Sequence, residues 1–207
     1  MVYSIVIAVL VSYLLGNLNG AVCISALMHD DVRSHGSGNA GLTNFIRNYG
    51  IGRALYVVLI DAGKAFLACL VSGLLLKPYD MYLAGMAIGG AAVMLGHDFP
   101  ALLGFKGGKG ILSGLFVALA IDWRIGLIIL GIFAVAYLLT KYVSLGSVLG
   151  GIAFAVCFAV FHYDNLVVMI CGVCMGLLAV IMHHENITRL LKGQERKTDL
   201  FSKNKKQ

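Results

Sequence analysis

Residues 51–76 read IGRALYVVLIDAGKAFLACLVSGLLL, an apolar run whose interior carries two charges, Asp61 and Lys64. An α-helix rises about 1.5 Å per residue, so the run is long enough to cross roughly 30 Å of hydrocarbon. Charges inside a membrane are costly and normally pair in the interior of a bundle, and spacing i, i+3 puts these two on one face. The run predicts a transmembrane helix with a structural ion pair; direct contact with a ligand is the alternative role.

Similar apolar runs recur along the chain. Hydrophobic residues make up 59% and charged residues only 13%, against about 25% charged residues in soluble domains. The eleven residues of Ile111–Ile121 rise only about 17 Å and predict a half-height or broken helix. We therefore predict an all-α integral membrane protein, a bundle of about seven transmembrane helices with one or two short ones, forming a single polytopic domain over residues 1–207. The predicted spans are Val2–Leu27, Ile51–Leu76, Met81–Leu95, Ile111–Ile121, Ile125–Leu139, Val143–Phe161 and Leu166–Met182.

The distribution of lysine and arginine predicts the orientation. Seven spans alternate sides, which puts the two termini on opposite faces of the membrane. Lys77 and Arg124 fall on the N-terminal side and Lys64 lies within a span, whereas thirteen cations fall on the other side. By the positive-inside rule the N-terminus faces outward and the C-terminus is cytoplasmic. The thirteen are Arg33, Arg47, Arg53, Lys106, Lys109, Lys141, Arg189, Lys192, Arg196, Lys197, Lys203, Lys205 and Lys206.

The net charge of +6 follows from this topology and from a basic cytoplasmic tail at about residues 183–207. Such a tail beside a membrane meets anionic lipid headgroups. Nucleic-acid binding needs a basic domain with readable elements, which the sequence lacks. The five cysteines lie within apolar runs, where a structural role is typical. No metal site and no cofactor are predicted.

Three glycine-rich polar segments interrupt the apolar chain on the predicted cytoplasmic side. The first reads HGSGNAGLTNFIR over residues 35–47. Gly36, Gly38 and Gly41 allow backbone N–H groups to point inward and bind an anion, and Arg47 offers a planar fork for phosphate. A polar turn is the structural alternative, but the density of polar side chains favours binding. The other polar candidates are Ser37, Asn39, Thr43 and Asn44.

The second segment reads GHDFPALLGFKGGKG over residues 96–110. It places two ammonium groups beside glycines that let a phosphate approach. Its position between spans, rather than between a strand and a helix, excludes a Walker-type loop. His97, next to Asp98, is a candidate proton acceptor, although a histidine at a membrane edge is often structural. The predicted phosphate-binding residues are Lys106, Gly107, Gly108 and Lys109.

The third segment ends the last span with His183, His184, Glu185 and Asn186. On a helix, His183 and Asn186 share a face by the i, i+3 rule. A polar helix end at the membrane interface is the structural alternative. Adjacent histidines point to different faces and no third ligand has suitable spacing, so this pair does not predict a metal site.

In order and spacing the three segments resemble the signatures of the bacterial membrane glycerol-3-phosphate acyltransferases that use acyl phosphate, the PlsY family. The matching runs are GSGNAGLTNFIRNYG from Gly36, GHDFPALLGFKGGKG from Gly96 and HHENITRLLKGQE from His183. The resemblance maps His183 and Asn186 onto the family's phosphate-contacting histidine and asparagine. It implies a multi-pass enzyme of the bacterial inner membrane with its active site on the cytoplasmic side.

The implied reaction moves a fatty acyl group from acyl phosphate to the 1-hydroxyl of sn-glycerol 3-phosphate, giving lysophosphatidic acid and phosphate in the first step of phospholipid synthesis. Acyl phosphate is a mixed anhydride with a good leaving group, so the protein needs to position two phosphates and stabilise developing charge. Ser37, His97, Lys109 and His183 are the expected catalytic residues. The resemblance favours the substrate's own phosphate over His97 as proton acceptor, and it implies a functional link to the enzyme that makes acyl phosphate.

Some positions depart from the family pattern. Leu42 replaces the usual alanine, His184 an arginine, Ile111-Leu112-Ser113 a Val-Ala-Thr pattern, and Asn17 and Asn19 a Ser-x-Pro. These changes predict the same reaction with altered pocket packing; a divergent paralogue is the alternative.

Two other functions are alternatives. A transporter or channel for phosphate or a phosphorylated solute would also need cationic glycine-rich loops. It should show charges or broken helices at the midplane, and two related halves. Asp61 and Lys64 are the only candidates in the sequence, and no halves correspond. An acyl-CoA-dependent enzyme with a His-x4-Asp dyad is disfavoured, because none of the six histidines has an aspartate five positions later.

Overall fold

The computed structural model describes residues 1–198, which contain helices and connecting loops and no strand. The prediction of an all-α membrane bundle is confirmed. Four helical segments are each long and apolar enough to cross a membrane. The first two segments include the short turn that follows the helix. The four helices are α4 (Ile51–Leu76), α5 (Tyr82–Asp98), α7 (Trp123–Thr140) and α8 (Val143–Phe161).

Two further spans are bent pairs of helices, with angles of 44° in the first pair and 54° in the second. The first pair corrects the predicted unbroken span Val2–Leu27. The break lies at residues 17–19. Asn19 has an extended backbone, its side chain accepts a hydrogen bond from the Val22 N–H, and it thereby caps the new helix. The pairs are α1 (Val2–Gly16) with α2 (Gly20–Ala26), and α9 (Leu166–Met182) with α10 (His184–Leu191).

The helix α6 (Ile111–Ile121) has eleven residues, as the sequence predicts. It is too short to cross the bilayer alone and packs against α4, α5 and α7. Its neighbours bury Val117 and Ala118 completely. With the four long helices and the two bent pairs, α6 accounts for the seven apolar runs of the sequence.

Helices α1 and α5 cross at two glycines. An added Cβ would lie 2.4 Å from the Val93 carbonyl oxygen at Gly16 and 2.1 Å from the Tyr13 carbonyl oxygen at Gly96. Membrane helices lack a hydrophobic force that pulls them together, so small residues that allow close backbone approach stabilise their contacts. This crossing brings the end of α5, which carries His97, against the break in the first span.

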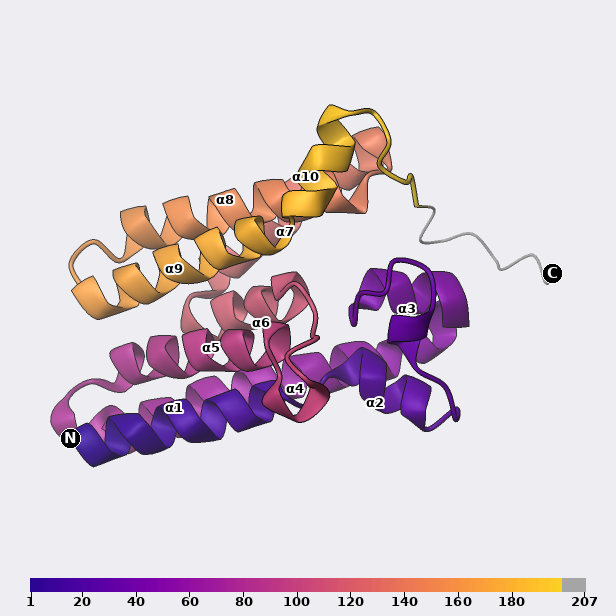
Figure 1. Ribbon diagram of the computed structural model, residues 1–207. Coiled ribbons are helices and arrows are strands. Elements are labelled where there is room, and N and C mark those ends of the chain that lie inside the picture. Colours follow the sequence, from indigo (N-terminus) through magenta and orange to yellow (C-terminus); the bar gives the residue numbers. More distant parts are fainter. Residues whose placement is uncertain (199–207) are drawn as a thin grey trace.

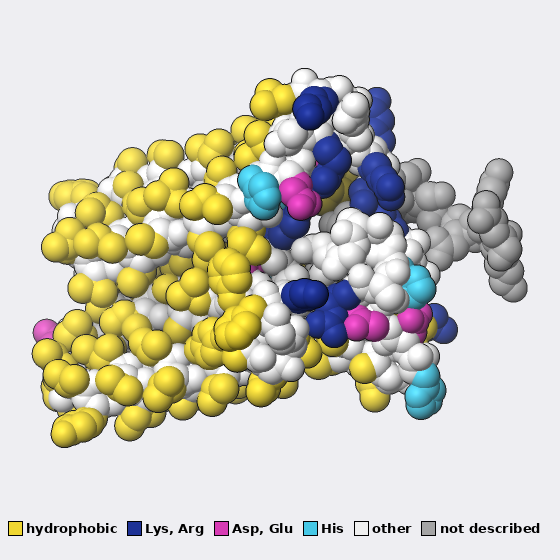
Figure 2. All heavy atoms as spheres, viewed as in Figure 1, with side chains coloured by type: hydrophobic (Ala, Val, Ile, Leu, Met, Phe, Trp, Pro, Cys, Tyr) yellow, Lys and Arg dark blue, Asp and Glu magenta, His cyan; other side chains and the backbone are white. Residues whose placement is uncertain are grey.

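The helices lie in two groups, with α1, α4, α5 and α6 on one side and α7, α8 and α9 on the other (Figure 1). A core of buried residues, including Met94, Val117, Phe154 and Phe158, joins them. Figure 2 shows hydrophobic side chains covering the membrane-spanning part and Lys and Arg gathered at the end with α3 (Leu42–Tyr49) and α10. The charged end is therefore separated from the apolar body, as the sequence predicts.

The stretch predicted as a basic cytoplasmic tail, at about residues 183–207, is described as far as residue 198. Residues 184–191 form α10, and residues 193–198 return toward the bundle. A left-handed backbone at Gly193, with φ of +65°, begins this return. Residues 199–207, with Lys203, Lys205 and Lys206, lie outside the described part of the chain.

Candidate active site

A pocket of about 680 Å³ lies at the charged end and is lined by all three polar segments. Every residue predicted for the site lines it except Gly36 and Lys64. The pocket continues as an apolar arm between α6, α7 and α8. The apolar residues of this arm are Ile111, Leu112, Leu115, Ile129, Leu130, Phe133, Val143, Gly146 and Gly150, and Ser144 and Ser147 of α8 add two hydroxyl groups to the lining.

The first polar segment is folded around Asn44, which is 2% exposed. Its amide nitrogen donates to the carbonyls of Val32, His35 and Asn39 at 2.9 to 3.1 Å. Its oxygen accepts the Ser37 N–H at 3.1 Å. Buried polar groups are rarely left unpaired, and this side chain has four partners within the loop. Asn44, which we predicted as a ligand, therefore organises the loop in this structure.

Gly36 and Gly38 have φ values of +60° and +70°, which glycine adopts without steric cost. The N–H groups of Ser37 and Gly38, however, are not free for the predicted anion nest. The Ser37 N–H is held by Asn44, and the Gly38 N–H donates to the His35 carbonyl at 3.0 Å. Ser37 itself is exposed in the pocket wall. These two N–H groups are therefore occupied within the loop, whereas Gly41, Leu42 and Thr43 at the start of α3 line the pocket.

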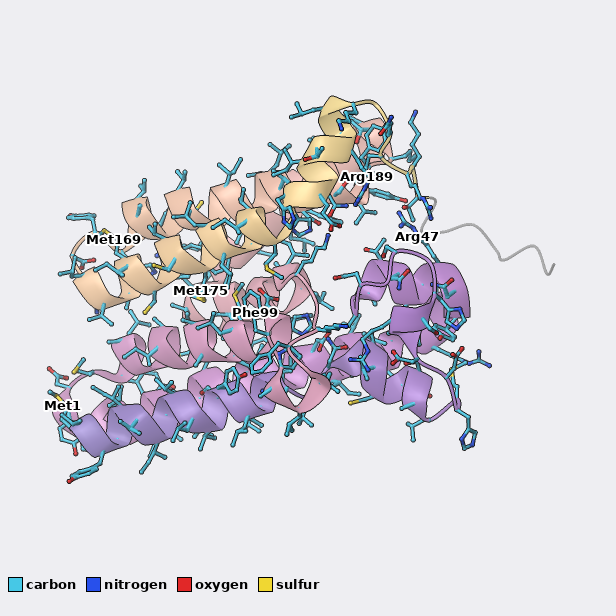
Figure 3. All side chains as sticks on the ribbon, in the orientation of Figure 1. Met1, Arg47, Phe99, Met169, Met175 and Arg189 are labelled. Carbon is cyan, nitrogen blue, oxygen red and sulfur yellow. The ribbon has the colours of Figure 1, made fainter. Side chains whose placement is uncertain are left out.

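Arg47 reaches the pocket from α3, whose opposite face is anchored by the fully buried Phe45. Phe45 packs against Tyr49 with ring centroids 4.8 Å apart and belongs to a small core with Val32 and Val57. The Arg47 Nε donates to Thr198 Oγ1 at 3.1 Å, and its Nη2 donates to the same oxygen. Figure 3 shows Arg47 and Arg189, from α3 and α10, at the charged end of the molecule.

His97 is buried beneath the second segment, 3% exposed. Lys64 Nζ lies 2.7 Å from His97 Nδ1 and 2.7 Å from Asp61 Oδ1. The other ring nitrogen faces the backbone of the lysine-glycine loop, because a Cβ on Gly108 would lie 2.1 Å from His97 Nε2. The Gly108 N–H also donates to the His97 carbonyl at 3.0 Å. The histidine thus joins the intramembrane ion pair to the loop above it.

Two asparagines in the break of the first span hold the polar segments in place. Asn17 Oδ1 accepts the Leu102 N–H at 3.0 Å, in the second segment. The Asn19 amide donates to the Ala40 carbonyl at 2.9 Å, in the first segment. Both side chains are buried. This geometry accounts for asparagine at two positions where the family pattern differs.

The third segment forms a polar network with the returning chain. Lys109 Nζ donates to Asn186 Oδ1, and the Asn186 amide donates to Glu195 Oε1 at 2.9 Å. Arg189 Nε donates to Glu195 Oε2 at 2.7 Å. Burial opposes ionisation of Glu195, but the hydrogen bonds from Arg189 and Asn186 hold its pKa below the ordinary value. Burial lowers the pKa of Lys109, so an anion beside it would favour the charged ammonium.

His183 lies at the bend between α9 and α10 and is 5% exposed. Its Nδ1 donates to the Ala179 carbonyl at 2.7 Å. This bond fixes the tautomer and leaves Nε2 as the acceptor of a neutral ring. His183 and Asn186, predicted to share a helix face, both line the pocket.

Sequence reasoning missed two parts of the pocket lining and one residue, Thr198, that contacts Arg47 from outside the lining. The apolar arm comes from helix residues that any membrane span could contain, so composition carries no signal for it. Arg189 and Glu195 lie within the run HHENITRLLKGQE, and their charge after the last apolar span was the signal in the sequence that could have identified them. Thr198 carries no sequence signal, because its role depends on the path of the returning chain.

Comparison with known proteins agrees with this geometry. The profile of the glycerol-3-phosphate acyltransferase family matches residues 6–193. The chain is 42% identical over 152 residues to a protein named glycerol-3-phosphate acyltransferase from Finegoldia magna, covering 73% of this chain and 74% of that one. A protein with the same name from Clostridioides difficile is 40% identical over 153 residues, with 72% and 74% covered.

The fold also matches a solved structure. A crystal structure of the integral membrane glycerol 3-phosphate acyltransferase PlsY in its glycerol 3-phosphate form aligns with a TM-score of 0.84 and 31% identity, covering 96% of this chain and 100% of that one. A second form, with lysophosphatidic acid, aligns with a TM-score of 0.83, 32% identity and coverage of 95% and 96%. The chain therefore belongs to the PlsY family of integral membrane glycerol-3-phosphate acyltransferases.

Proposed function

We propose that this protein transfers a fatty acyl group from acyl phosphate to the 1-hydroxyl of sn-glycerol 3-phosphate, releasing lysophosphatidic acid and phosphate. The observation that supports it most strongly is one pocket that is lined both by the cations Arg47 and Lys109 and by the apolar arm. A reaction that joins an anionic acceptor to an acyl chain needs both. Relatives solved with glycerol 3-phosphate and with lysophosphatidic acid support the acceptor and the product.

In the proposed mechanism, Arg47 and Lys109 hold the phosphates, and Ser37 and His183 help to position them. The 1-hydroxyl oxygen attacks the acyl carbonyl carbon, and the bond from that carbon to the phosphate oxygen breaks. Cations that already face the phosphates stabilise the developing charge without reorganisation. Asn186 orients Lys109 through their hydrogen bond.

The substrate's phosphate is the proposed acceptor of the hydroxyl proton. His97 is less suited to that role, because its Nδ1 faces Lys64 and its Nε2 faces Gly108. A general base must lie within hydrogen-bonding reach of the proton that it accepts. We propose that His97 instead supports the lysine-glycine loop.

The proposed function is tested with purified protein in detergent, supplied with acyl phosphate and glycerol 3-phosphate. Lysophosphatidic acid and phosphate should form in equal amounts, and acyl-CoA should not replace acyl phosphate. Equal turnover with both donors would contradict the donor assignment. A transporter would instead move phosphate across reconstituted vesicles and form no lysophosphatidic acid.

The apolar arm predicts which residue limits the acyl chain. At Gly150 an added Cβ would lie 3.4 Å from Ile129 Cγ2, an ordinary contact, so alanine fits there. A leucine at this position would fill the arm. We expect Gly150→Leu to lower kcat/KM about tenfold or more for a long-chain acyl phosphate, because contacts with buried methylenes are lost.

Acyl phosphates of increasing length measure this effect, with Gly150→Ala as the control. The leucine variant should keep its activity on short chains, whereas the alanine variant should resemble the native protein on every donor. An equal loss on all chain lengths would show that the arm does not hold the acyl chain.

We propose that the protein is a single domain in the bacterial inner membrane with its active site facing the cytoplasm. The asymmetry of its cations supports this orientation.

In a cysteine-free variant, cysteines placed at the exposed Ser37 and Lys197 should react with a membrane-impermeant thiol reagent only from the cytoplasmic side. A cysteine at the exposed Asp80 should react only from outside. Labelling of Ser37→Cys from outside would overturn the orientation.

Acyl phosphate is a reactive mixed anhydride, which favours transfer soon after its synthesis. We therefore propose a functional link to the enzyme that forms acyl phosphate. The basic groups at the cytoplasmic end also support contact with anionic lipid headgroups.

A further inference from the structure

After α10 the chain turns back (Figure 1), and Glu195 and Arg196 of this stretch line the pocket. Two residues tie the return segment, residues 193–198, to the site. Glu195 accepts hydrogen bonds from Asn186 and Arg189, and Thr198 accepts from Arg47. Residues 194–198 lie beyond the part of the chain that the family profile matches. The return segment therefore touches phosphate-binding candidates on both sides of the pocket.

The position of Thr198 is set by the end of α7. Its backbone N–H donates to the Lys141 carbonyl at 3.0 Å, and the Tyr137 hydroxyl donates to its carbonyl at 3.1 Å. Thr198 is 5% exposed. These backbone bonds hold the threonine in place and leave its hydroxyl to act on another group.

That other group is the Arg47 guanidinium, which comes from α3 on the opposite side of the pocket. Both Nε and Nη2 of Arg47 donate to Thr198 Oγ1. A long arginine side chain loses rotamer entropy when it is ordered. A contact that orders it before the substrate arrives removes this cost from binding.

We propose that Thr198 is a positioning residue for acyl transfer, whose hydroxyl holds the Arg47 guanidinium in the orientation that receives a substrate phosphate. The hydroxyl accepts along the Nε edge and leaves other N–H donors of the planar fork for the phosphate. Because a hydroxyl carries no charge, it orients the guanidinium without neutralising it. A carboxylate at the same place would compete with the phosphate.

The inference rests on the proposed role of Arg47 in phosphate binding, and steady-state kinetics test it. Thr198→Val removes the acceptor and keeps the side-chain shape. We expect this variant to raise KM for glycerol 3-phosphate about fivefold to tenfold with little change in kcat, since a lost orienting bond weakens a charged contact without removing it. Thr198→Ser keeps the hydroxyl and should restore KM.

Two controls separate orientation from general damage. Thr188→Val removes a hydroxyl that donates to the His184 carbonyl within α10, and should leave KM and kcat unchanged. In an Arg47→Lys background, which lacks the Nε edge, Thr198→Val should cause no further rise in KM. Thermal unfolding of each variant in detergent checks that the bundle is intact.

The outcomes are distinct. An unchanged KM in a folded Thr198→Val variant, or equal loss in the valine and serine variants, overturns the inference. A lower KM in Thr198→Val would show that the threonine competes with phosphate and would also overturn it. If the native protein itself failed to transfer the acyl group, the proposed function would fail instead.

Discussion

Lys109→Ala is expected to lower kcat/KM for acyl transfer about tenfold to a hundredfold, the cost of removing a charged hydrogen bond from a partly desolvated site. Lys109 is flanked by glycines, lines the pocket and is oriented by Asn186. Arg47→Ala should have an effect of similar size. Arg47→Lys should also be impaired, because a lysine keeps the charge and loses the planar fork. The measurement is initial rate against glycerol 3-phosphate concentration.

Lys106→Ala is the matched comparison, because Lys106 lies in the same loop and is exposed to solvent. Water screens an exposed charge, so the loss of Lys106 should matter less than the loss of Lys109.

His97→Ala should lower the rate only mildly if the substrate phosphate accepts the proton, and should lower it about a hundredfold or more if His97 is the general base. Native rates and an unchanged KM in folded Arg47→Ala and Lys109→Ala variants would disprove the proposed site.

Asp61→Ala is expected to destabilise the protein by about 3–5 kcal/mol, because it leaves the Lys64 ammonium buried without its counter-ion. Each side chain of this pair is 2% exposed, and the two charges lie 2.7 Å apart. Lys64 also donates to the Leu18 carbonyl at 2.9 Å, so the break in the first span depends on it. Thermal unfolding in detergent and the yield of folded protein measure the loss.

A double variant shows whether the charge itself is the cause. Asp61→Leu combined with Lys64→Met removes both charges and should recover much of the stability, as apolar replacements of buried ion pairs often do. Its activity should still be reduced, because His97 loses the partner at its Nδ1. If Asp61→Ala had the same unfolding temperature as the native protein, the ion pair would have no structural role.

The transmembrane helices could be predicted closely because their signal is local. The bilayer demands an apolar run of sufficient length, and Ile111–Ile121 and Val143–Phe161 begin and end in the structure where the sequence places them. The break at residues 17–19 was missed because Leu18 and Ala21 continue the apolar run. Tertiary contacts of Asn17 and Asn19 with the two polar segments stabilise that break.

The candidate site was predictable in its residue types and less so in its roles. Clusters of glycine, cation and amide are rare in an apolar chain, and nearly all of those singled out line one pocket. Whether a polar side chain faces a ligand or another part of the protein is a different question. Asn44 is turned into its own loop by three carbonyls, and no pattern in the sequence specifies that orientation.

The sequence by itself determined the membrane bundle, its apolar spans and the three polar segments, because hydrophobic run length and local composition are properties of neighbouring residues. Only the tertiary structure decided that Thr198 meets Arg47 across 151 positions and that Lys64 joins Asp61 to His97. Those contacts depend on how helices pack and where the chain returns. Packing is a property of the whole fold, since each approach requires space that distant residues leave open.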